Sequence, residues 1–156
     1  MKLSVIVPVY NEEQTVAKLL EHLHQVDQVK EIVVVDDGST DQTVAKIEAL
    51  DLPKIKLFQK ENGGKGSAVR YGLDKVGGDY VLIQDADLEY DPQDISELVK
   101  GLDRQGVKVV YGSRFLGPHS NLLFCHLAVN LFLNLFFNFL YDISLLDMYT
   151  FYNLIP

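Results

Sequence analysis

Short apolar runs alternate with helix-like segments along residues 1–114. The runs are rich in Val and Ile and only four to seven residues long, which is typical of buried strands. Strands that alternate with helices form parallel sheets covered on both sides. The sequence therefore predicts an α/β fold, a Rossmann-related, mostly parallel sheet with helices on both faces. The predicted strands are Leu3–Val9, Ile32–Val35, Ile55–Phe58, Tyr80–Ile83 and Val107–Tyr111, and the predicted helices are Glu12–Val26, Thr40–Leu50, Ser67–Val76 and Asp91–Leu102.

The charge balance excludes one large class of function. The 156-residue chain has 14 basic and 22 acidic side chains, a net charge of −8. General nucleic-acid binding needs a basic surface to replace phosphate counterions, so we expect no nucleic-acid partner. The single cysteine, Cys125, excludes an intrachain disulfide and a cysteine-based zinc site. The N-terminus does not resemble a signal peptide, and we expect a cytoplasmic protein.

Polar, ligand-type side chains follow each predicted strand. In parallel α/β sheets, ligands bind at the carboxyl ends of the strands. The five following loops should therefore converge on one edge of the sheet, and this convergence carries more weight than any single motif. The loops are 8–13, 36–41, 61–66, 85–89 and 112–114.

The loop after the fourth predicted strand is acidic. Asp85 and Asp87 leave a buried strand, and Glu89 follows two residues later. If the chain stays extended, these three carboxylates lie on one side. Mg²⁺ usually takes one or two carboxylates plus substrate phosphates, and such a metal can stabilise a departing nucleoside diphosphate. The alternative is a cluster that caps the next helix, although Asp91 already serves that purpose.

The first two loops suit a nucleoside. Tyr10 offers a face on which a base can stack. Asp36 and Asp37 are adjacent acids where a turn needs only one, so one of them can accept from a base N–H or a ribose hydroxyl. Glu12 can accept from a ring N–H, or it can simply complement a helix N-terminus.

Basic side chains in two other loops suit phosphate. Segment 62–66 is rich in glycine and contains Lys65, and backbone N–H groups together with an ammonium bind phosphate well. The segment is not a Walker A loop, and no G-x-G-x-x-G follows the first strand, which argues against a dinucleotide-binding domain. Arg114, the last Lys or Arg of the chain, can clamp phosphate or form a surface ion pair.

Five motifs run in unbroken order through residues 2–115. They are Pro8-Val-Tyr10-Asn11-Glu12-Glu13, Val33-Val-Val35-Asp36-Asp37-Gly38-Ser39-Thr40-Asp41, Gly64-Lys65-Gly66, Gln84-Asp85-Ala86-Asp87-Leu88-Glu89-Tyr90-Asp91-Pro92 and Val110-Tyr-Gly112-Ser113-Arg114. Together they resemble the family-2 inverting glycosyltransferases with the GT-A fold. Within that family they most resemble the polyprenyl- and dolichyl-phosphate mannose and glucose synthases.

The resemblance implies a hexosyltransferase with a GDP-mannose or UDP-glucose type of donor, Mg²⁺ or Mn²⁺, and a polyprenyl or dolichyl phosphate as acceptor. It makes Asp87 and Glu89 the metal ligands and Asp87 and Arg114 the catalytic residues. It gives no general base, and an ionised phosphate oxygen needs little help from one. With Lys65 added on the phosphate argument, the expected donor-binding residues are Pro8, Tyr10, Glu12, Val35, Asp37, Lys65, Asp85, Ala86, Asp87 and Arg114.

The end of the chain matches the family only weakly. His126 and Asn130 resemble one of its motifs, but Phe151 and Asn153 replace an expected Cys and Lys. We therefore expect a donor-binding domain over 1–115 and an apolar tail over 116–156 that begins an incomplete acceptor side. A truncated, non-catalytic donor-binding module and a soluble family-2 enzyme with a carbohydrate acceptor remain alternatives.

The tail is apolar but carries one polar stripe. Residues 115–141 contain no Lys, Arg, Asp or Glu, and a polar side chain recurs every four residues. This spacing favours a helix with one polar face. It can lie on a membrane through residues 116–142, at the cytoplasmic face. It can also pack on the body or a second copy of the chain, or span a bilayer. The stripe comprises His126, Asn130, Asn134, Asn138 and Asp142.

Overall fold

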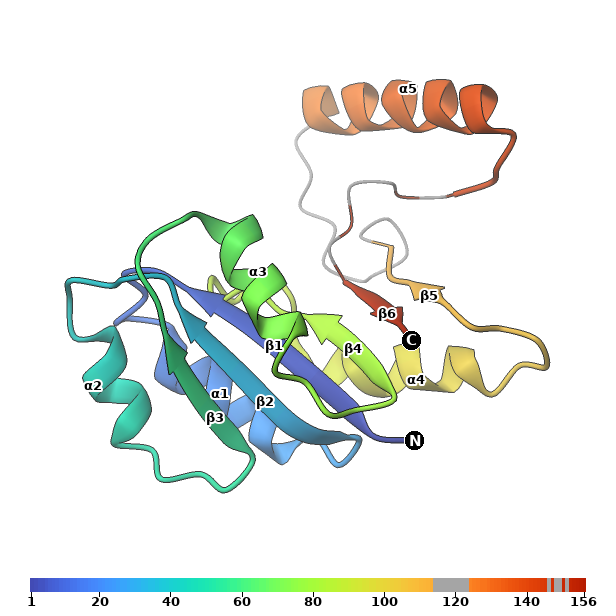
Figure 1. Ribbon diagram of the computed structural model, residues 1–156. Coiled ribbons are helices and arrows are strands. Elements are labelled where there is room, and N and C mark those ends of the chain that lie inside the picture. Colours follow the sequence, from blue (N-terminus) through green and yellow to red (C-terminus); the bar gives the residue numbers. More distant parts are fainter. Residues whose placement is uncertain (114–123, 146, 148–149, 151) are drawn as a thin grey trace.

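The computed structural model describes residues 1–113, 124–145, 147, 150 and 152–156, and it contains the predicted alternation of strands and helices (Figure 1). The strands and helices of the described residues are β1 (Leu3–Val9), α1 (Val16–Gln25), β2 (Val29–Asp36), α2 (Thr43–Glu48), β3 (Ile55–Gln59), α3 (Lys65–Leu73), β4 (Tyr80–Ile83), the 3-10 helix η1 (Pro92–Asp94), α4 (Ile95–Leu102), β5 (Val110–Tyr111), α5 (Phe124–Tyr141) and β6 (Asn153–Ile155).

The strands form one mixed sheet in the order β3-β2-β1-β4-β6-β5. β1 pairs in parallel with β2 and β4, and β2 pairs in parallel with β3, which confirms a mostly parallel sheet. β6 was not predicted, and it runs antiparallel between β4 and β5. The tail of the sequence thus returns to complete the sheet, with Leu154 beside both Leu82 and Val110.

Both faces of the sheet are covered, and the composition of β1 shows why. All seven of its residues are buried, and all except Ser4 are apolar, so the strand does not alternate between apolar and polar residues. Leu3, Val5 and Val7 belong to the core cluster that includes α1, while Ile6 packs with Ala68 of α3 on the opposite face. Gly72 lets α3 approach closely, since a Cβ there would lie 2.7 Å from Ile6 Cγ2.

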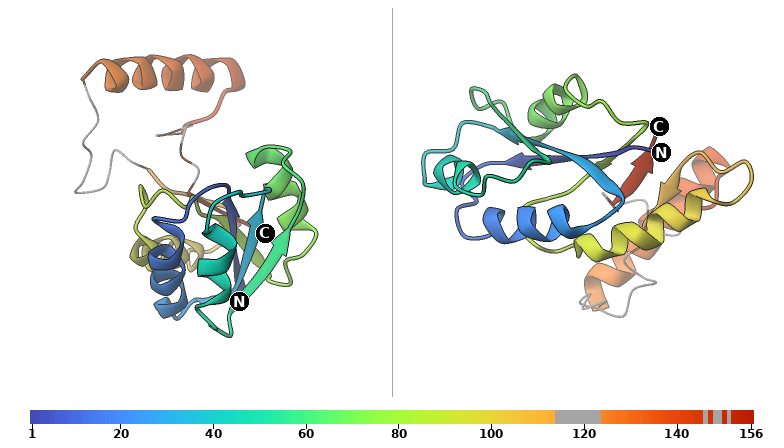
Figure 2. Two further views of the ribbon diagram at one scale, coloured as in Figure 1. Left: turned by 90° about the vertical axis from the view of Figure 1, so that its left-hand side faces the viewer. Right: turned by 90° about the horizontal axis from the view of Figure 1, so that it is seen from below.

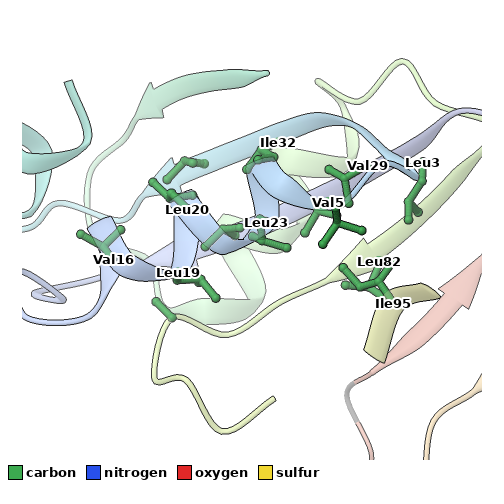
Figure 3. Close-up of a cluster of buried hydrophobic side chains, with 14 of the residues drawn as sticks. Leu3, Val5, Val16, Leu19, Leu20, Leu23, Val29, Ile32, Leu82 and Ile95 are labelled. Carbon is green, nitrogen blue, oxygen red and sulfur yellow. The ribbon is translucent and has the colours of Figure 1, made fainter. Parts of the chain in front are cut away.

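The larger core lies between the sheet and α1. Val16, Leu19, Leu20 and Leu23 recur at helical spacing and are fully buried against the strands (Figure 3). Figure 2 shows α1 and α4 on one side of the sheet and α3 on the other. The predicted arrangement of helices on both faces is therefore confirmed.

Two helices begin later than their sequence patterns predicted. α1 starts at Val16 instead of Glu12, and α2 at Thr43 instead of Thr40. The residues before each helix form cross-loop hydrogen bonds instead, such as the one from Glu12 N to Thr43 Oγ1 (2.8 Å). These early residues build the loops at the carboxyl edge of the sheet.

α5 stands apart from the sheet in Figure 1 and in the left-hand view of Figure 2. One side of the helix exposes large apolar side chains, among them Leu135 and Phe139 at 71% and 83% exposure. The polar side faces the chain's own return segment. Asn134 Nδ2 and Asn138 Nδ2 both donate to Leu145 O, and Leu145 N donates back to Asn138 Oδ1. Among the described residues, no helix is both long and apolar enough to cross a membrane.

Candidate functional site

A cavity of about 250 Å³ opens at the carboxyl edge of the sheet. Its walls come from the ends of β1, β2 and β4 and from the first turns of α3, so loops far apart in sequence do converge there. The lining residues are Pro8, Val9, Tyr10, Glu12, Asp37, Lys65, Ala68, Asp85, Ala86 and Asp87.

Hydrogen bonds tie the loops after β1 and β2 together. Asn11 adopts a left-handed conformation (φ 55°), and its N–H donates to Ser39 Oγ (2.9 Å). Its side-chain oxygen accepts from Thr40 N (2.8 Å). The loop between β1 and α1 is thereby fixed against the start of α2. Tyr10 stays 49% exposed at the rim, where its ring is open for stacking, and Glu12 accepts from Thr15 Oγ1 (2.8 Å).

Asp37 is the buried acid of the cavity, with only 3% of its surface exposed. Its carboxylate accepts from Lys60 Nζ (2.6 Å), Gly63 N (3.1 Å) and Gly64 N (2.7 Å). Burial alone would raise the pKa of this carboxyl, but the bonds from Lys60, Gly63 and Gly64 hold the pKa below its ordinary value. Asp37 is therefore ionised at neutral pH.

Asp85 faces the first turn of α3 across the cavity. Lys65 Nζ lies 2.7 Å and 2.8 Å from its two carboxylate oxygens. The pair places an ammonium and a helix N-terminus beside the first acid of the acidic loop. This combination of donors suits a phosphate group.

The acidic loop turns where the sequence analysis assumed an extended chain. Leu88 is left-handed (φ 63°), and Glu89 N donates to Asp87 Oδ1 (3.0 Å). Strict alternation of the three carboxylates is therefore wrong. Asp87 lines the cavity, whereas Glu89 is exposed beside it and does not.

The donor chemistry of the acidic loop fits a hard divalent cation. Carboxylate oxygens are what Mg²⁺ and Mn²⁺ take from proteins. Within the ranges that the structure describes, no group of three or more acidic, His or Cys side chains is arranged to hold an ion. Mg²⁺ usually takes one or two carboxylates from a protein, and phosphate and water complete its shell.

Among the expected donor-binding residues that the structure describes, Val35 does not line the cavity. Val35 is fully buried and packs with Ile6 and Val33, because its side chain points into the core beneath α3. Arg114 lies outside the described residues, so its predicted contact with phosphate stays a prediction.

Three neighbours of the site were missed by the sequence analysis. Val9 and Ala68 line the cavity, and Gln84 supports the acidic loop through bonds from Nε2 to Asp85 O and Tyr90 O. Val9 adjoins predicted residues, and Ala68 lies on the first turn after the glycine-rich segment. Their closeness in sequence to predicted site residues could have indicated that Val9 and Ala68 also line the site.

Comparison with known families identifies the class of this protein. The model of glycosyl transferase family 2 matches residues 4–147, nearly the whole chain. The chain therefore belongs to this family, which consists of enzymes of the transferase type, and the predicted resemblance is confirmed.

Individual relatives show which members of the family this chain resembles. It is 38% identical over 117 residues to the undecaprenyl-phosphate 4-deoxy-4-formamido-L-arabinose transferase of Photorhabdus laumondii, covering 70% of this chain and 36% of the relative. It is 35% identical over 120 residues to the dolichol-phosphate mannosyltransferase of Pyrococcus furiosus, covering 74% and 34%. The chain thus spans about a third of the length of these relatives, and it resembles the polyprenyl-phosphate sugar transferases.

A solved structure supports the fold. A mannosyltransferase from Pyrobaculum calidifontis, in complex with GDP-Man and Mn²⁺, matches with a TM-score of 0.60 and 32% identity. The match covers 69% of this chain and 34% of that one. The GT-A-like α/β architecture predicted from the sequence is confirmed.

Proposed function

We propose that this chain forms the donor side of a metal-dependent glycosyltransferase. The reaction moves a hexose from a nucleotide sugar, of the GDP-mannose or UDP-glucose type, to a polyprenyl or dolichyl phosphate. Residues 1–115 supply the donor site, and residues 116–156 supply the beginning of the acceptor and membrane side.

One observation carries the proposal. A single cavity gathers an aromatic ring, a buried ionised carboxylate, an ammonium at a helix N-terminus and an acidic loop. Tyr10 and Asp37 suit the base, Lys65 suits a phosphate, and Asp85 and Asp87 suit the ribose and the metal. A nucleoside diphosphate with a bound divalent cation offers a base, a ribose, phosphates and a metal for these side chains to contact.

Catalysis here rests on positioning and charge. The acceptor's phosphate oxygen is already ionised, so attack on the sugar needs no dedicated base. Asp87 and Glu89 would hold the divalent ion, which would supply charge stabilisation for the departing diphosphate. Lys65 adds a positive charge on the same side, and Arg114 is proposed to add a second.

The acceptor side is proposed to lie on a membrane. The relatives named above act with undecaprenyl and dolichol phosphates, which are membrane lipids. The polar side of α5 is bonded to the chain itself, so its exposed apolar side is free for the lipid surface. We propose peripheral attachment at the cytoplasmic face. Pairing of two copies through the same side of α5 is the competing arrangement, and sedimentation without lipid distinguishes it.

Calorimetric titration of the whole chain tests the donor site. UDP, GDP, UDP-glucose and GDP-mannose are added with Mn²⁺ and again with EDTA. Binding of one nucleotide pair that is lost with EDTA supports the proposal and identifies the base. Turnover is then measured with a polyprenyl phosphate. A folded chain that binds none of the four overturns the proposal, and binding without turnover favours a non-catalytic donor-binding module.

Asp87→Ala sharpens this test, and it should abolish Mn²⁺-dependent donor binding. Asp79→Ala is the matched control, because Asp79 lies just before β4, at the opposite end from the acidic loop, and its side chain is 62% exposed. Unchanged Mn²⁺-dependent binding by Asp87→Ala would exclude Asp87 as a metal ligand.

A further inference from the structure

Lys60 lies directly behind the donor cavity and was not singled out by its sequence pattern. Its backbone N–H donates to Asp36 O (3.0 Å), which extends the pairing of β2 and β3 by one residue. Its side chain is 18% exposed, and Nζ contacts Asp37 Oδ1 (2.6 Å) and the carbonyl oxygen of Glu61. Lys60 does not line the cavity, so any effect on a ligand passes through Asp37.

The segment that carries Lys60 is packed tightly against the end of β2. Gly38 has a positive φ (80°), and a Cβ there would lie 3.0 Å from Asn62 N. A Cβ on Gly63 would lie 3.0 Å from Lys60 Nζ. Lys60 and the backbone of Gly63 and Gly64 all donate to the carboxylate of Asp37, and unlike Asp37 none of the three lines the cavity.

These bonds leave the carboxylate of Asp37 with few unoccupied hydrogen-bond acceptor sites. An ionised carboxylate offers about four acceptor sites. Three donors of the chain, Lys60 Nζ, Gly63 N and Gly64 N, already occupy most of them. Asp37 lines the cavity, so its carboxylate can accept about one further N–H from a ligand there.

We propose that Lys60 is the positioning residue of the nucleoside subsite. Its ion pair holds the carboxylate of Asp37 in one orientation, with a single acceptor site presented to a base that carries a ring N–H. Uracil and guanine carry such an N–H, whereas cytosine and adenine present a ring nitrogen lone pair at the corresponding edge. This inference rests on the proposed function and assigns to Lys60 the selection of the base class.

The chain contains a matched ion pair for comparison. Lys56 of β3 contacts Glu31 of β2 at 2.6 Å, the same distance as in the pair of Lys60 with Asp37. Glu31 also accepts from Ser4 Oγ and Gly77 N, so it too is a hydrogen-bonded carboxylate. It lies near the opposite ends of the strands and lines no part of the donor cavity.

The experiment measures nucleotide affinity for the whole chain with Mn²⁺. UDP and GDP are compared with CDP and ADP, for the wild type and for Lys60→Met, Lys60→Gln, Lys60→Arg and Lys56→Met. Thermal melting monitors folding. Lys60→Gln keeps a donor without the charge and serves if Lys60→Met does not fold.

Lys60→Met should weaken binding of the preferred nucleotide about tenfold, the size expected for loss of a charge-assisted hydrogen bond. The ratio of its affinity for the preferred nucleotide to its affinity for CDP or ADP should also decrease. Lys60→Arg should restore most of the affinity and most of this ratio. Lys56→Met should leave the affinity and the ratio unchanged. Because the pKa of Asp37 rises when Lys60 is removed, binding by Lys60→Met should fail at a higher pH than in the wild type.

The pH readout separates positioning from a general loss of structure. The other ionisable groups that line the cavity are Tyr10, Glu12, Lys65, Asp85 and Asp87, and Asp36 adjoins Asp37 in sequence. All of them are present in every variant, so a shift that follows Lys60 belongs to its pair with Asp37. Wild-type affinity, discrimination and pH profile in Lys60→Met overturn the inference while leaving the proposed function intact. Absence of nucleotide binding in the wild type overturns both.

Discussion

α1 and α5 both carry an apolar side, which is buried against the sheet in α1 and exposed in α5. Leu19, Leu20 and Leu23 of α1 are fully buried by the sheet. In α5, Leu135 and Phe139 are exposed, while Asn138 on the other side bonds to the chain's own backbone. A hydrophobic stripe therefore identifies a face that needs cover. In α1 the sheet covers that face, whereas in α5 the chain bonds to the polar side and leaves the apolar side exposed.

The largest expected contrast is in stability. Leu20→Ala removes a fully buried side chain from the main core and should lower the free energy of unfolding by about 2–5 kcal/mol. Leu135→Ala removes the same atoms from an exposed position and should change it by less than about 0.5 kcal/mol. Urea unfolding measures both. Equal losses would show that α5 is covered as α1 is.

Membrane binding gives the second contrast. Leu135→Asp combined with Phe139→Asp should weaken binding to phosphatidylcholine vesicles by at least about tenfold, because both side chains would leave the apolar interface. Flotation of vesicles with bound protein measures this. Leu73→Asp, at an exposed leucine of α3, is the control for added negative charge. If the control weakens binding equally, α5 is not the contact.

A smaller effect is expected on the polar side of α5. Asn138→Ala removes both of its hydrogen bonds with Leu145 and should cost about 1–3 kcal/mol locally. Hydrogen exchange at the Leu145 amide should become correspondingly faster. Ser144→Ala changes an exposed neighbour and should leave this exchange rate unaltered.

The smallest expected effect is that of acid, which should lower the free energy of unfolding through Glu31 of the sheet and not through α5. Burial alone would raise the pKa of Glu31, but bonds from Lys56, Ser4 and Gly77 hold it below its usual 4.5. Because the folded pKa is lowered, the stabilisation is complete above the ordinary pKa and is lost as the pH falls below it. Each unit of lowering is worth about 1.4 kcal/mol. Urea unfolding from pH 7 to pH 3 should show this loss, reduced in Glu31→Gln. An unreduced loss would assign the acid sensitivity to other carboxylates.

Local patterns predicted much of the fold, because strands and helices of the body are set by nearby residues. β1 and β4 were predicted with their observed bounds, and the helical spacing of α1 with its buried face. β6 was missed because three residues carry almost no pattern, and its identity as a strand depends on β4 and β5.

The candidate site was predictable where residues follow strands directly, and eight of the ten predicted donor-binding residues line one cavity. Val35 was placed among them because its motif includes it, but alternation along β2 turns its side chain into the core. Lys60 escaped notice because its role depends on the packing of β3 beside β2. Long-range contacts of this kind leave no periodic trace in the sequence.

The position of β6 has a consequence for synthesis. Within the described part of the chain, β5 pairs with β6 and with no other strand, and β6 reaches β4 from about 70 residues further along the chain. The edge of β4 that pairs with β6 therefore stays open until residues 153–155 emerge from the ribosome. The described residues that line the cavity all lie between positions 8 and 87. A growing chain can thus bind a nucleotide before β6 joins the sheet, and the bound nucleotide would then stabilise the partly formed sheet.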